Sequence, residues 1–390
     1  MTTVVVIGGG GAMAQPALRL LARRADLDLV VADVRLPAAD AAARAVGARA
    51  LGLDVTEPHA LRSALEPADL VVNVAGPFFR FAVPILTAAI DTGTHYIDIC
   101  DDWEPIEEMF DLHDSALAAG LTAIIGMGAS PGLSNLLAAL AVRELDDVVD
   151  LFTGWPVDVD FEGGRERGSS EDVAGLGAAA VHWMQQISGS ITTLSDGSPV
   201  ASTPLEPIEL TYPNRGRGTA YVVGHPEPIM FRRSLRPSGA SANVMVVTEG
   251  TIAFLDGLRH GIDAGALTLD EAAAEINRPS PTRVARAALS SLRKAGPGKL
   301  PGFFAMARGS RDGTPKTVGA RLVTAPKGMA GVTGIPLAIA AGQVLDGLVS
   351  TRGVLGPESS VDPTGMFTEL AAYCAAPGST WTDIVRIDVA

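Results

Sequence analysis

The stretch VVVIGGGGAMA, residues 4–14, gives the strongest indication of the fold of this chain. Its run of β-branched residues at 4–7 is typical of a strand buried on both faces of a parallel sheet. Four glycines follow at once, residues 12–24 carry apolar side chains at helical spacing, and a second apolar run occupies residues 28–33. The stretch therefore predicts a strand, a tight turn, a helix and a second strand, which together form one βαβ unit.

The glycine spacing within this unit predicts a dinucleotide site. Gly9, Gly11 and Ala14 fit the pattern G-x-G-x-x-G/A, in which one glycine makes the turn, one admits the pyrophosphate and a small third residue allows close packing. Ala12 and Met13 lead into the helix, whose N-terminus would receive the pyrophosphate. The alternative is a structural turn, because glycine-rich turns also occur wherever a strand meets a helix.

An acidic residue at the end of the second strand supports the dinucleotide interpretation. Asp33 lies about 20 residues beyond the glycines, where a carboxylate can bind the ribose hydroxyls. Its charge would repel a 2'-phosphate, which favours NAD over NADP. Arg35, two residues later, would partly offset that repulsion, so NADP stays possible.

The alternation of strands and helices continues to about residue 135. We expect helices at 36–46 and 58–65 and strands at 48–53 and 69–74. Since open α/β sheets bind ligands at strand carboxyl ends, the residues that follow the strands are predicted cofactor contacts. Asp54 and Val55 would lie beside adenine, and the nicotinamide half would meet Asn73, Ala75, Gly76 and Pro77. A plain Gly-Pro turn is the alternative for the last of these segments.

Composition restricts the class of protein. At 390 residues and 47% hydrophobic, the chain is long enough for two or three domains. A formal charge of -14 argues against nucleic acid and anionic membranes as partners. The 2 cysteines suit a reducing, cytoplasmic location, and no uncharged run suggests a membrane span. The 6 histidines show no metal-ligand spacing, so no metal is expected.

Six sequence blocks together resemble the saccharopine dehydrogenase-like family, which includes saccharopine reductases and lysine 6-dehydrogenases. The blocks cover nearly the whole chain: GGGGAMA at 8–14, NVAGPFF at 73–79, HYIDICDD at 95–102, GMGASPGLSN at 126–135, GHPEP at 224–228, and the segment 331–358. Ala14 departs from the glycine of many relatives. The 101–102 and 224–228 blocks look most similar to lysine 6-dehydrogenase-like members.

The resemblance implies an α/β fold with a Rossmann domain at 1–135, a second α/β substrate domain at 136–328, and a C-terminal segment, 329–390, that packs back on the first domain. It also implies a homodimer. The sequence of the second part fits this picture, because extended stretches at 149–157, 208–212, 220–223, 241–247 and 302–322 alternate with turns. Residues 188–203 read as polar and turn-rich, 335–348 as a buried apolar helix, and Thr268 as the start of another helix.

Two acidic segments are candidates for proton handling. Asp101 and Asp102 follow the strand that ends near residue 99, where they would hold a substrate ammonium or act as base; capping of the helix at Trp103 is an equal alternative. His225 and Glu227 stand between prolines in the GHPEP segment, which would present both side chains rigidly. An ordinary exposed loop is the alternative there.

Three further side chains are candidates of lower weight. His182 would shuttle a proton if it faced a cleft, although packing on a helix surface is the plainer expectation. Arg215 and Arg217 would clamp a substrate carboxylate, although two solvated arginines are the plainer expectation.

We therefore predict an NAD(P)-dependent amino-acid dehydrogenase that acts on a carbon-nitrogen bond of a small amino-acid or imine substrate. Asp102, His225, Glu227 and His182 are its predicted catalytic residues, and Asp101, Arg215 and Arg217 its predicted substrate contacts. An imine reductase that forms a secondary amine is the first alternative. A dinucleotide-binding regulator without turnover is the second, because fold never guarantees chemistry.

Overall fold

The computed structural model describes residues 1–162, 177–376 and 378–390. It divides into two compact units, each described here by itself: Met1–Leu136 with Ala325–Ile384, and Leu137–Thr324 with Val385–Ala390. The expected α/β class is confirmed. The boundaries differ from the expected ones at the C-terminus, because residues 385–390 belong to the second unit rather than to the first.

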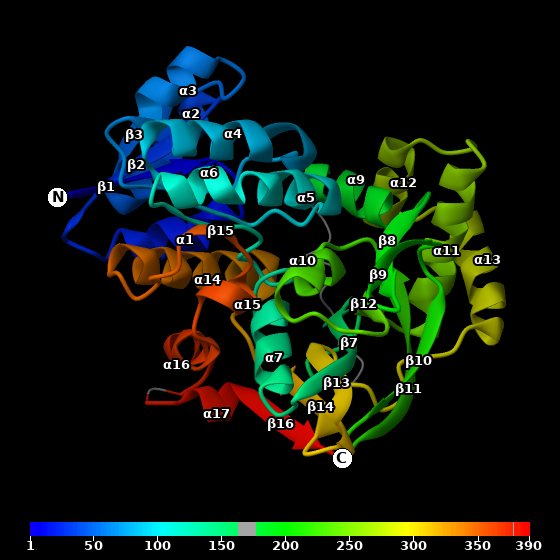
Figure 1. Ribbon diagram of the computed structural model, residues 1–390. Coiled ribbons are helices and arrows are strands. Elements are labelled where there is room, and N and C mark those ends of the chain that lie inside the picture. Colours follow the sequence, from blue (N-terminus) through cyan, green and yellow to red (C-terminus); the bar gives the residue numbers. More distant parts are fainter. Residues whose placement is uncertain (163–176, 377) are drawn as a thin grey trace. The chain divides into compact units, whose positions relative to one another are not determined.

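The first unit is a doubly wound parallel sheet (Figure 1). Among the described residues its strand order is β15-β6-β5-β4-β1-β2-β3, with every pair parallel. The strands are β1 (Thr2–Ile7), β2 (Leu27–Asp33), β3 (Arg49–Gly52), β4 (Leu70–Asn73), β5 (His95–Asp98), β6 (Thr122–Ile124) and β15 (Gly353–Leu355). Since β1 lies between β2 and β4, the order reverses at its carboxyl end, which is where such sheets bind ligands.

Helices cover both faces of this sheet. Figure 1 shows α1 (Ala14–Leu21) and α14 (Gly328–Leu345) on one side, and α4 (Phe78–Thr92) and α6 (His113–Ala118) on the other. The remaining helices of the unit are α2 (Leu36–Val46), α3 (Pro58–Leu65), α5 (Trp103–Asp111), α15 (Pro357–Ser360), α16 (Pro363–Cys374) and α17 (Trp381–Ile384), and α7 (Leu133–Val142) begins in it.

Helix α14 corrects one expectation. It is the one helix of the described residues that is long and apolar enough to cross a membrane, whereas the sequence suggested no such run. Its residues Leu337, Ile339 and Val344 are buried, and the helix packs against α1 and α16. Close packing on α1 requires Gly334, where a Cβ atom would lie 2.7 Å from the carbonyl oxygen of Met13. The helix therefore belongs to the core of the first unit.

The second unit is built on a mixed sheet. Among the described residues its main order is β10-β11-β12-β7-β13-β14-β16, and only β12 and β7 pair in parallel. These strands are β7 (Asp147–Pro156), β10 (Pro207–Tyr212), β11 (Gly216–Val223), β12 (Ser241–Val246), β13 (Phe304–Arg311), β14 (Thr314–Leu322) and β16 (Val385–Val389). The last strand joins this sheet because its backbone pairs with the edge strand β14.

One segment of the second unit was predicted wrongly. Residues 188–203, which were expected to form turns, contain a hairpin of β8 (Ile191–Ser195) and β9 (Ser198–Ser202). Strand β8 also pairs with β12 and so joins the hairpin to the main sheet. Ile191 and Leu194 are buried in the strand, so tertiary packing outweighs the polar composition.

The helices of this unit are α9 (Gly177–Gln186), α10 (Glu227–Ser234), α11 (Glu249–Asp263), α12 (Leu269–Asn277) and α13 (Pro281–Ser290), followed by the short helix η1 (Ser291–Arg293). Thr268 begins α12 with a complete capping box, as expected.

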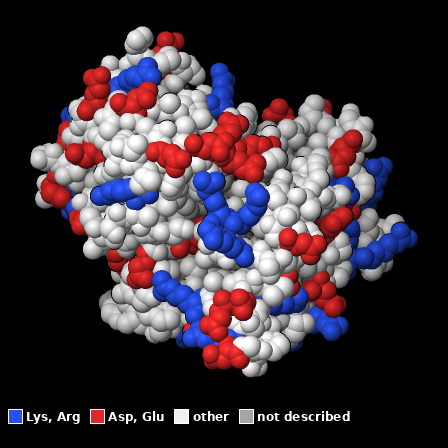
Figure 2. All heavy atoms as spheres, in the orientation of Figure 1, with Lys and Arg blue, Asp and Glu red and all other residues white. Residues whose placement is uncertain are grey.

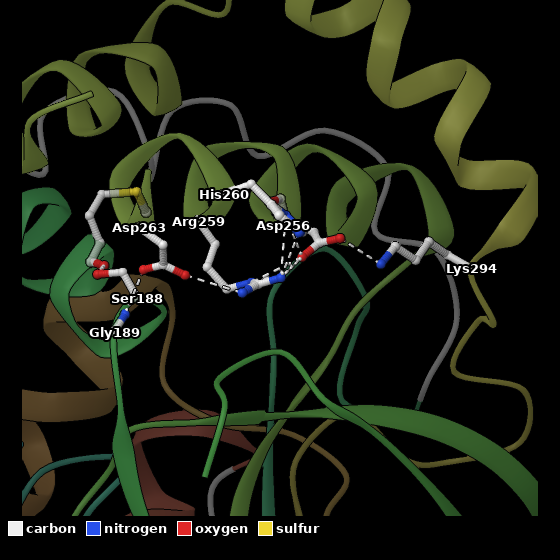
Figure 3. Close-up of polar contacts among 8 residues, drawn as sticks. Ser188, Gly189, Asp256, Arg259, His260, Asp263 and Lys294 are labelled. Carbon is white, nitrogen blue, oxygen red and sulfur yellow. Dashed lines mark hydrogen bonds and ion pairs between the residues drawn. The ribbon is translucent and has the colours of Figure 1, made fainter. Parts of the chain in front are cut away.

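Charged side chains fasten α11 to its neighbours (Figure 3). Asp256 contacts Lys294 at 2.8 Å and Arg259 at 2.8 Å, and Arg259 also reaches Asp263 at 3.1 Å. Asp263 accepts a hydrogen bond from the amide of Gly189, ahead of β8. Each of these charges is opposed by another, so we assign the group to structure rather than chemistry. Figure 2 shows acidic and basic side chains interspersed on the face that it draws.

Candidate functional site

The turn between β1 and α1 accepts only glycine at its first two positions. Gly8 has φ +79°, and a Cβ atom there would lie 2.8 Å from the backbone of Ala75. At Gly9 a Cβ atom would lie 2.5 Å from the side chain of Val31. The amide of Gly11 donates to the carbonyl of Gly8 at 3.0 Å and closes the turn. The backbone can thus run close to a ligand at the carboxyl end of β1.

The start of α1 completes this turn. Ala14 is fully buried, as the small third residue of the pattern should be, and no side chain caps the helix at Met13. Gln15 donates from its side-chain amide to the carbonyls of Gly9 and Gly11. The Gln15 backbone amide donates to the carbonyl of Ala12 at 3.2 Å and Pro16 carries no N–H, so among the first three residues of α1 only the Ala14 amide can serve an anion, while the Gln15 side chain holds the glycine carbonyls. Gln15 was not predicted, although it follows the glycine pattern directly.

Asp33 is fixed by backbone amides at the end of β2. Its carboxylate is 6% exposed and accepts hydrogen bonds from the amide of Gly10 at 3.1 Å and of Arg35 at 2.9 Å. The Arg35 guanidinium lies 3.6 Å from the same carboxylate and is mostly exposed. A Cβ atom at Gly10 would lie 2.8 Å from Asp33, so glycine is needed there as well. The acidic side chain is held beside the glycine turn, where a ribose would lie.

Asp54 and Val55 follow β3 on the same edge. Asp54 accepts hydrogen bonds from the amide and the hydroxyl of Thr56, which lower the pKa of its carboxyl. Val55 lines a cavity of about 490 Å³ formed by α3 and α4, together with Leu61, Phe81 and Pro84. The Arg80 guanidinium lies 5.2 Å from the centre of the Phe81 ring. This apolar hollow has the size for a flat ring such as adenine.

The loop after β4 is held by buried side chains. Asn73 is buried, accepts a hydrogen bond from the amide of Ala75 at 3.0 Å, and donates to the hydroxyl of Tyr96 at 3.0 Å. Gly76 and Pro77, joined by a cis peptide bond, are exposed beyond Ala75. The structure thus places Asn73, Ala75, Gly76 and Pro77 on the edge that carries the glycine turn.

Asp101 and Asp102 follow β5 in the first unit. Asp102 is 6% exposed and stands at the N-terminus of α5, but its carboxylate accepts the amide of Phe79, in the first turn of α4, at 3.1 Å. Its side chain therefore caps α4 rather than α5. Asp101 is partly exposed. A role for either residue in proton transfer stays a prediction.

Glu227 and His225 form a buried acid-base pair in the second unit. Glu227 begins α10 and is fully buried, and Asn243 on β12 donates to its carboxylate at 2.7 Å. His225 is 4% exposed, and its Nδ1 atom lies 3.5 Å from the other carboxylate oxygen. The indole of Trp155 on β7 donates to the Asn243 side chain at 2.9 Å, and its ring lies 5.6 Å from the imidazole. We call these four residues the Glu227 cluster.

Strand pairing brings this cluster together. Asn243 lies on β12 opposite Thr153 of β7, and the Asn243 amide also donates to the Thr153 hydroxyl at 3.0 Å. Asn243 and Trp155 were not predicted. The available signal was a polar residue in the apolar strand SANVMV, because a buried amide requires partners.

His182 lies on α9 of the second unit. Its Nε2 atom lies 2.7 Å from the side-chain nitrogen of Gln186, and since an amide nitrogen only donates, the imidazole accepts. The backbone carbonyl of Gln186 accepts the amide of Gly224, the residue before His225. Trp183 lies 6.3 Å from Trp155, ring to ring. Helix α9 therefore supports the segment that carries His225.

The structure does not bring Arg215 and Arg217 to the Glu227 cluster. Arg215 contacts Glu162 at 2.9 Å and donates to the carbonyl of Lys299. Arg217 is mostly exposed and lies 3.3 Å from Glu209 of the neighbouring strand. Both occupy the β10–β11 hairpin region, where they pair with acidic or carbonyl groups of their own chain. Among the described residues, no three His, Cys, Asp or Glu side chains gather where they would hold a metal ion.

Comparison with known proteins agrees with this geometry. Residues 4–124 match a family model described as the saccharopine dehydrogenase NADP binding domain, and residues 174–374 match the saccharopine dehydrogenase C-terminal domain. Saccharopine dehydrogenase [NADP(+), L-glutamate-forming] of Saccharomyces cerevisiae is 31% identical over 144 residues, 37% of this chain and 30% of that protein. Carboxyaminopropylagmatine dehydrogenase of Synechocystis sp. is 25% identical over 160 residues, 38% of this chain and 40% of that protein. These matches thus span less than half the length of either relative.

Solved structures share the fold over the full chain. Apo saccharopine dehydrogenase (L-Glu forming) from Saccharomyces cerevisiae has a TM-score of 0.63 at 19% identity, with 100% of both chains covered. Homospermidine synthase from Legionella pneumophila in complex with NAD has a TM-score of 0.58 at 12% identity, covering 100% of this chain and 91% of that one. The second family model alone matches more than half of the sequence. The chain therefore belongs to the saccharopine dehydrogenase-like family and carries its nicotinamide-dinucleotide-binding domain.

Proposed function

We propose that this protein is a nicotinamide-dinucleotide-dependent oxidoreductase that acts on a carbon-nitrogen bond of an amino acid or a related amine. Family membership supports the cofactor class, and the activities for which the relatives are named, saccharopine and carboxyaminopropylagmatine dehydrogenases, support an amino-acid or amine substrate. The observation that carries the proposal is the fully buried Glu227 carboxylate 3.5 Å from His225, because buried acid-base pairs of this kind are suited to proton transfer.

The first unit would hold the dinucleotide. The glycine turn at 8–11 and the start of α1 would hold the pyrophosphate; the tight turn depends on glycine, since a Cβ atom at Gly8 would clash with the backbone of Ala75 and one at Gly9 with the side chain of Val31. Asp33 would bind the ribose, and the hollow beside Val55 would take the adenine. When bound, the nicotinamide supplies the hydride acceptor or donor of the reaction.

The second unit would manage the proton. A substrate ammonium must lose a proton before hydride leaves its carbon, so that the nitrogen lone pair can form the new C=N bond. Glu227 and His225 can accept that proton as a pair, and water added to the resulting iminium then releases ammonia or an amine. The partly exposed Trp155 would stabilise a cation next to the pair through its ring face. Asn243 would orient the carboxylate, which it contacts at 2.7 Å.

Asp33 supports NAD as the preferred dinucleotide. A 2'-phosphate would meet a carboxylate that is fixed by two backbone amides and therefore cannot turn away at low cost. The yeast relative is named for NADP, so the preference proposed here distinguishes this chain from that protein. Arg35, at 3.6 Å, would reduce the repulsion without removing the negative charge.

Imine reduction is the reverse direction of the same chemistry and stays the second candidate. The sequence supported it through a possible carboxylate clamp at Arg215 and Arg217. Both arginines instead contact acidic residues of the same chain, Glu162 and Glu209. A regulator without turnover is the third candidate. The buried Glu227 and His225 weigh against a regulator, because burying two titratable groups lowers the stability of the fold and a protein without turnover gains nothing from it. The homodimer and the cytoplasmic location also stay predictions.

The test is a turnover assay that follows reduced nicotinamide absorbance with NAD and NADP in separate reactions. The substrates are lysine, ornithine, diaminopimelate, saccharopine and simple α-amino acids. We expect turnover with one amine, preferentially with NAD, and its loss in Glu227→Gln. Glu209→Gln is the matched control, because it makes the same change in an exposed carboxylate. Binding of NAD without turnover in either direction would leave the regulator as the better assignment.

A further inference from the structure

One buried carboxylate in the first unit contacts the backbone of two strand-end loops. Asp98 is the last residue of β5 and is fully buried. One of its carboxylate oxygens accepts the amide of Cys100 at 3.0 Å, in the loop after β5, and the amide of Gly126 at 2.7 Å, in the loop after β6. The backbone carbonyl of Asp98 accepts the amide of Met127 at 2.7 Å. The ends of β5 and β6 are thus tied to the same residue.

The other carboxylate oxygen reaches the loop after β4. It accepts the hydroxyl of Tyr96 at 2.7 Å, and that hydroxyl accepts the side-chain amide of Asn73. Asn73 in turn accepts the amide of Ala75, at the start of the exposed Gly76 and Pro77 segment. Tyr96 and Asp98 are two residues apart on one strand, so their side chains point to the same face of the sheet. We call Asp98, Tyr96, Asn73 and the amides that they bind the Asp98 network.

The position of this network gives it a specific consequence. Asn73 and Asp98 are paired in register at the ends of β4 and β5, and β6 ends on the other side of β5. These are the strand ends beyond the switch point at β1, on the side away from β2 and Asp33. In a doubly wound sheet the adenosine half of a dinucleotide lies on the β2 side and the nicotinamide half on the β4 side.

We propose that Asp98 is a positioning residue that holds the loops after β4, β5 and β6 in the arrangement that receives the nicotinamide half of the cofactor. This inference rests on the proposed use of a nicotinamide dinucleotide. Both carboxylate oxygens of Asp98 are already engaged, by two backbone amides and by the Tyr96 hydroxyl, so the residue acts through the backbone of 75–77, 100 and 126. The glycine turn and Asp33, which would hold the rest of the cofactor, have no bond to the network among the contacts described above.

The test compares two ligands that differ in the nicotinamide ring. NAD and ADP-ribose share the adenine, both riboses and the pyrophosphate, and calorimetric titration gives the Kd of each. For Asp98→Asn and Tyr96→Phe we expect the Kd of NAD to rise about tenfold, the effect of one or two lost hydrogen bonds, and the Kd of ADP-ribose to stay within about twofold. Tyr96→Phe also keeps the ring that packs in the core, which protects folding.

Thr94→Val is the matched control. Thr94 is buried just before β5 and donates to the carbonyl of Leu65 at 3.1 Å, away from the strand carboxyl ends. It should cost stability while leaving the ratio of the two dissociation constants unchanged. Hydrogen exchange of the apoprotein gives an independent readout, because Tyr96→Phe should speed exchange at Ala75 and Thr94→Val should not.

Two outcomes would overturn the inference. If the Asp98 and Tyr96 variants weaken NAD and ADP-ribose equally, the network serves general stability; if they weaken neither, the loops hold their geometry without it. A wild-type protein that binds ADP-ribose but not NAD would contradict the proposed function instead, because the nicotinamide half would have no site. These results are distinguishable in the same titrations.

Discussion

Asp98 in the first unit and Glu227 in the second are both fully buried carboxylates, yet they have different kinds of partner. Asp98 accepts two backbone amides and a tyrosine hydroxyl. Glu227 contacts the side chains of Asn243 and His225. Backbone amides do not titrate near neutral pH and fix the carboxylate in place, whereas an imidazole can take up and release a proton. The partners of a buried acid, rather than its burial, therefore indicate whether it organises structure or takes part in chemistry.

The largest effect is expected when the pair of His225 and Glu227 in the second unit is broken. His225→Phe keeps a ring against Trp155 but removes both nitrogens next to Glu227. We expect turnover to fall by about 100- to 10,000-fold, the usual contribution of a general acid-base residue, with little change in the melting temperature. Steady-state kinetics on the substrate found in the amine panel measures the first and thermal unfolding the second. An equal fall in stability and turnover would make His225 a structural residue.

The second prediction concerns the pH dependence that Asp98 gives the fold. Burial, as the largest cause, raises the pKa of this carboxyl from 3.8 to about 6, while its hydrogen bonds oppose the rise and the nearby Asp101 adds to it. Because the folded state holds the proton more tightly than the unfolded state, this contribution to stability is fully present below pH 4. It is lost as the pH rises through about 6.

The size of this loss is on the order of 3 kcal/mol, since one pKa unit corresponds to about 1.4 kcal/mol. Urea unfolding of the wild type and of Asp98→Asn between pH 4 and 7 measures it as a difference. The neighbouring Tyr96 and Cys100 do not interfere, because burial raises the pKa of both above their ordinary values. A difference that is flat across this range would contradict the assignment.

The third prediction uses Asp33, which accepts backbone amides as Asp98 does but stands where the ribose would lie. Asp33→Asn keeps an acceptor for the Gly10 amide and removes the charge. We expect the ratio of the NADP to the NAD dissociation constant to fall about tenfold. Asp28→Asn, on the same strand and paired with Arg49, is the control and should leave the ratio unchanged. An unaltered ratio in Asp33→Asn would mean that another residue selects the cofactor.

The smallest effect separates the two arginines that the sequence suggested as a substrate clamp. Arg217 is mostly exposed beside Glu209, so Arg217→Ala should change the unfolding free energy by less than about 0.5 kcal/mol. Arg215 contacts Glu162 and the Lys299 carbonyl, so Arg215→Ala should lower the unfolding free energy by more, about 1 kcal/mol. Neither should change the KM of the substrate. A rise in KM for either variant would restore its predicted role in binding a carboxylate.

Much of the first unit could be predicted from the sequence, because each local pattern of residues there is typical of one kind of secondary structure. A β-branched run, four glycines and an apolar helix form a βαβ unit, and the acidic residue at the end of the next strand follows the same pattern. The hairpin at β8 and β9 did not follow, because its residues are polar and become a strand only through pairing with β12.

The dinucleotide-binding fold, the glycine turn and the choice of the GHPEP segment as a candidate site could be predicted from residue types alone, because each depends on residues close together in the chain. Which side chains meet depends on the packing of distant segments. Asn243 reaches Glu227 because β12 pairs with β7 and α10 begins beside them. Asp102 caps α4 rather than its own helix, and β16 leaves the first unit for the sheet of the second. Contacts of this kind join segments far apart in the chain, so no local pattern of residue types specifies them.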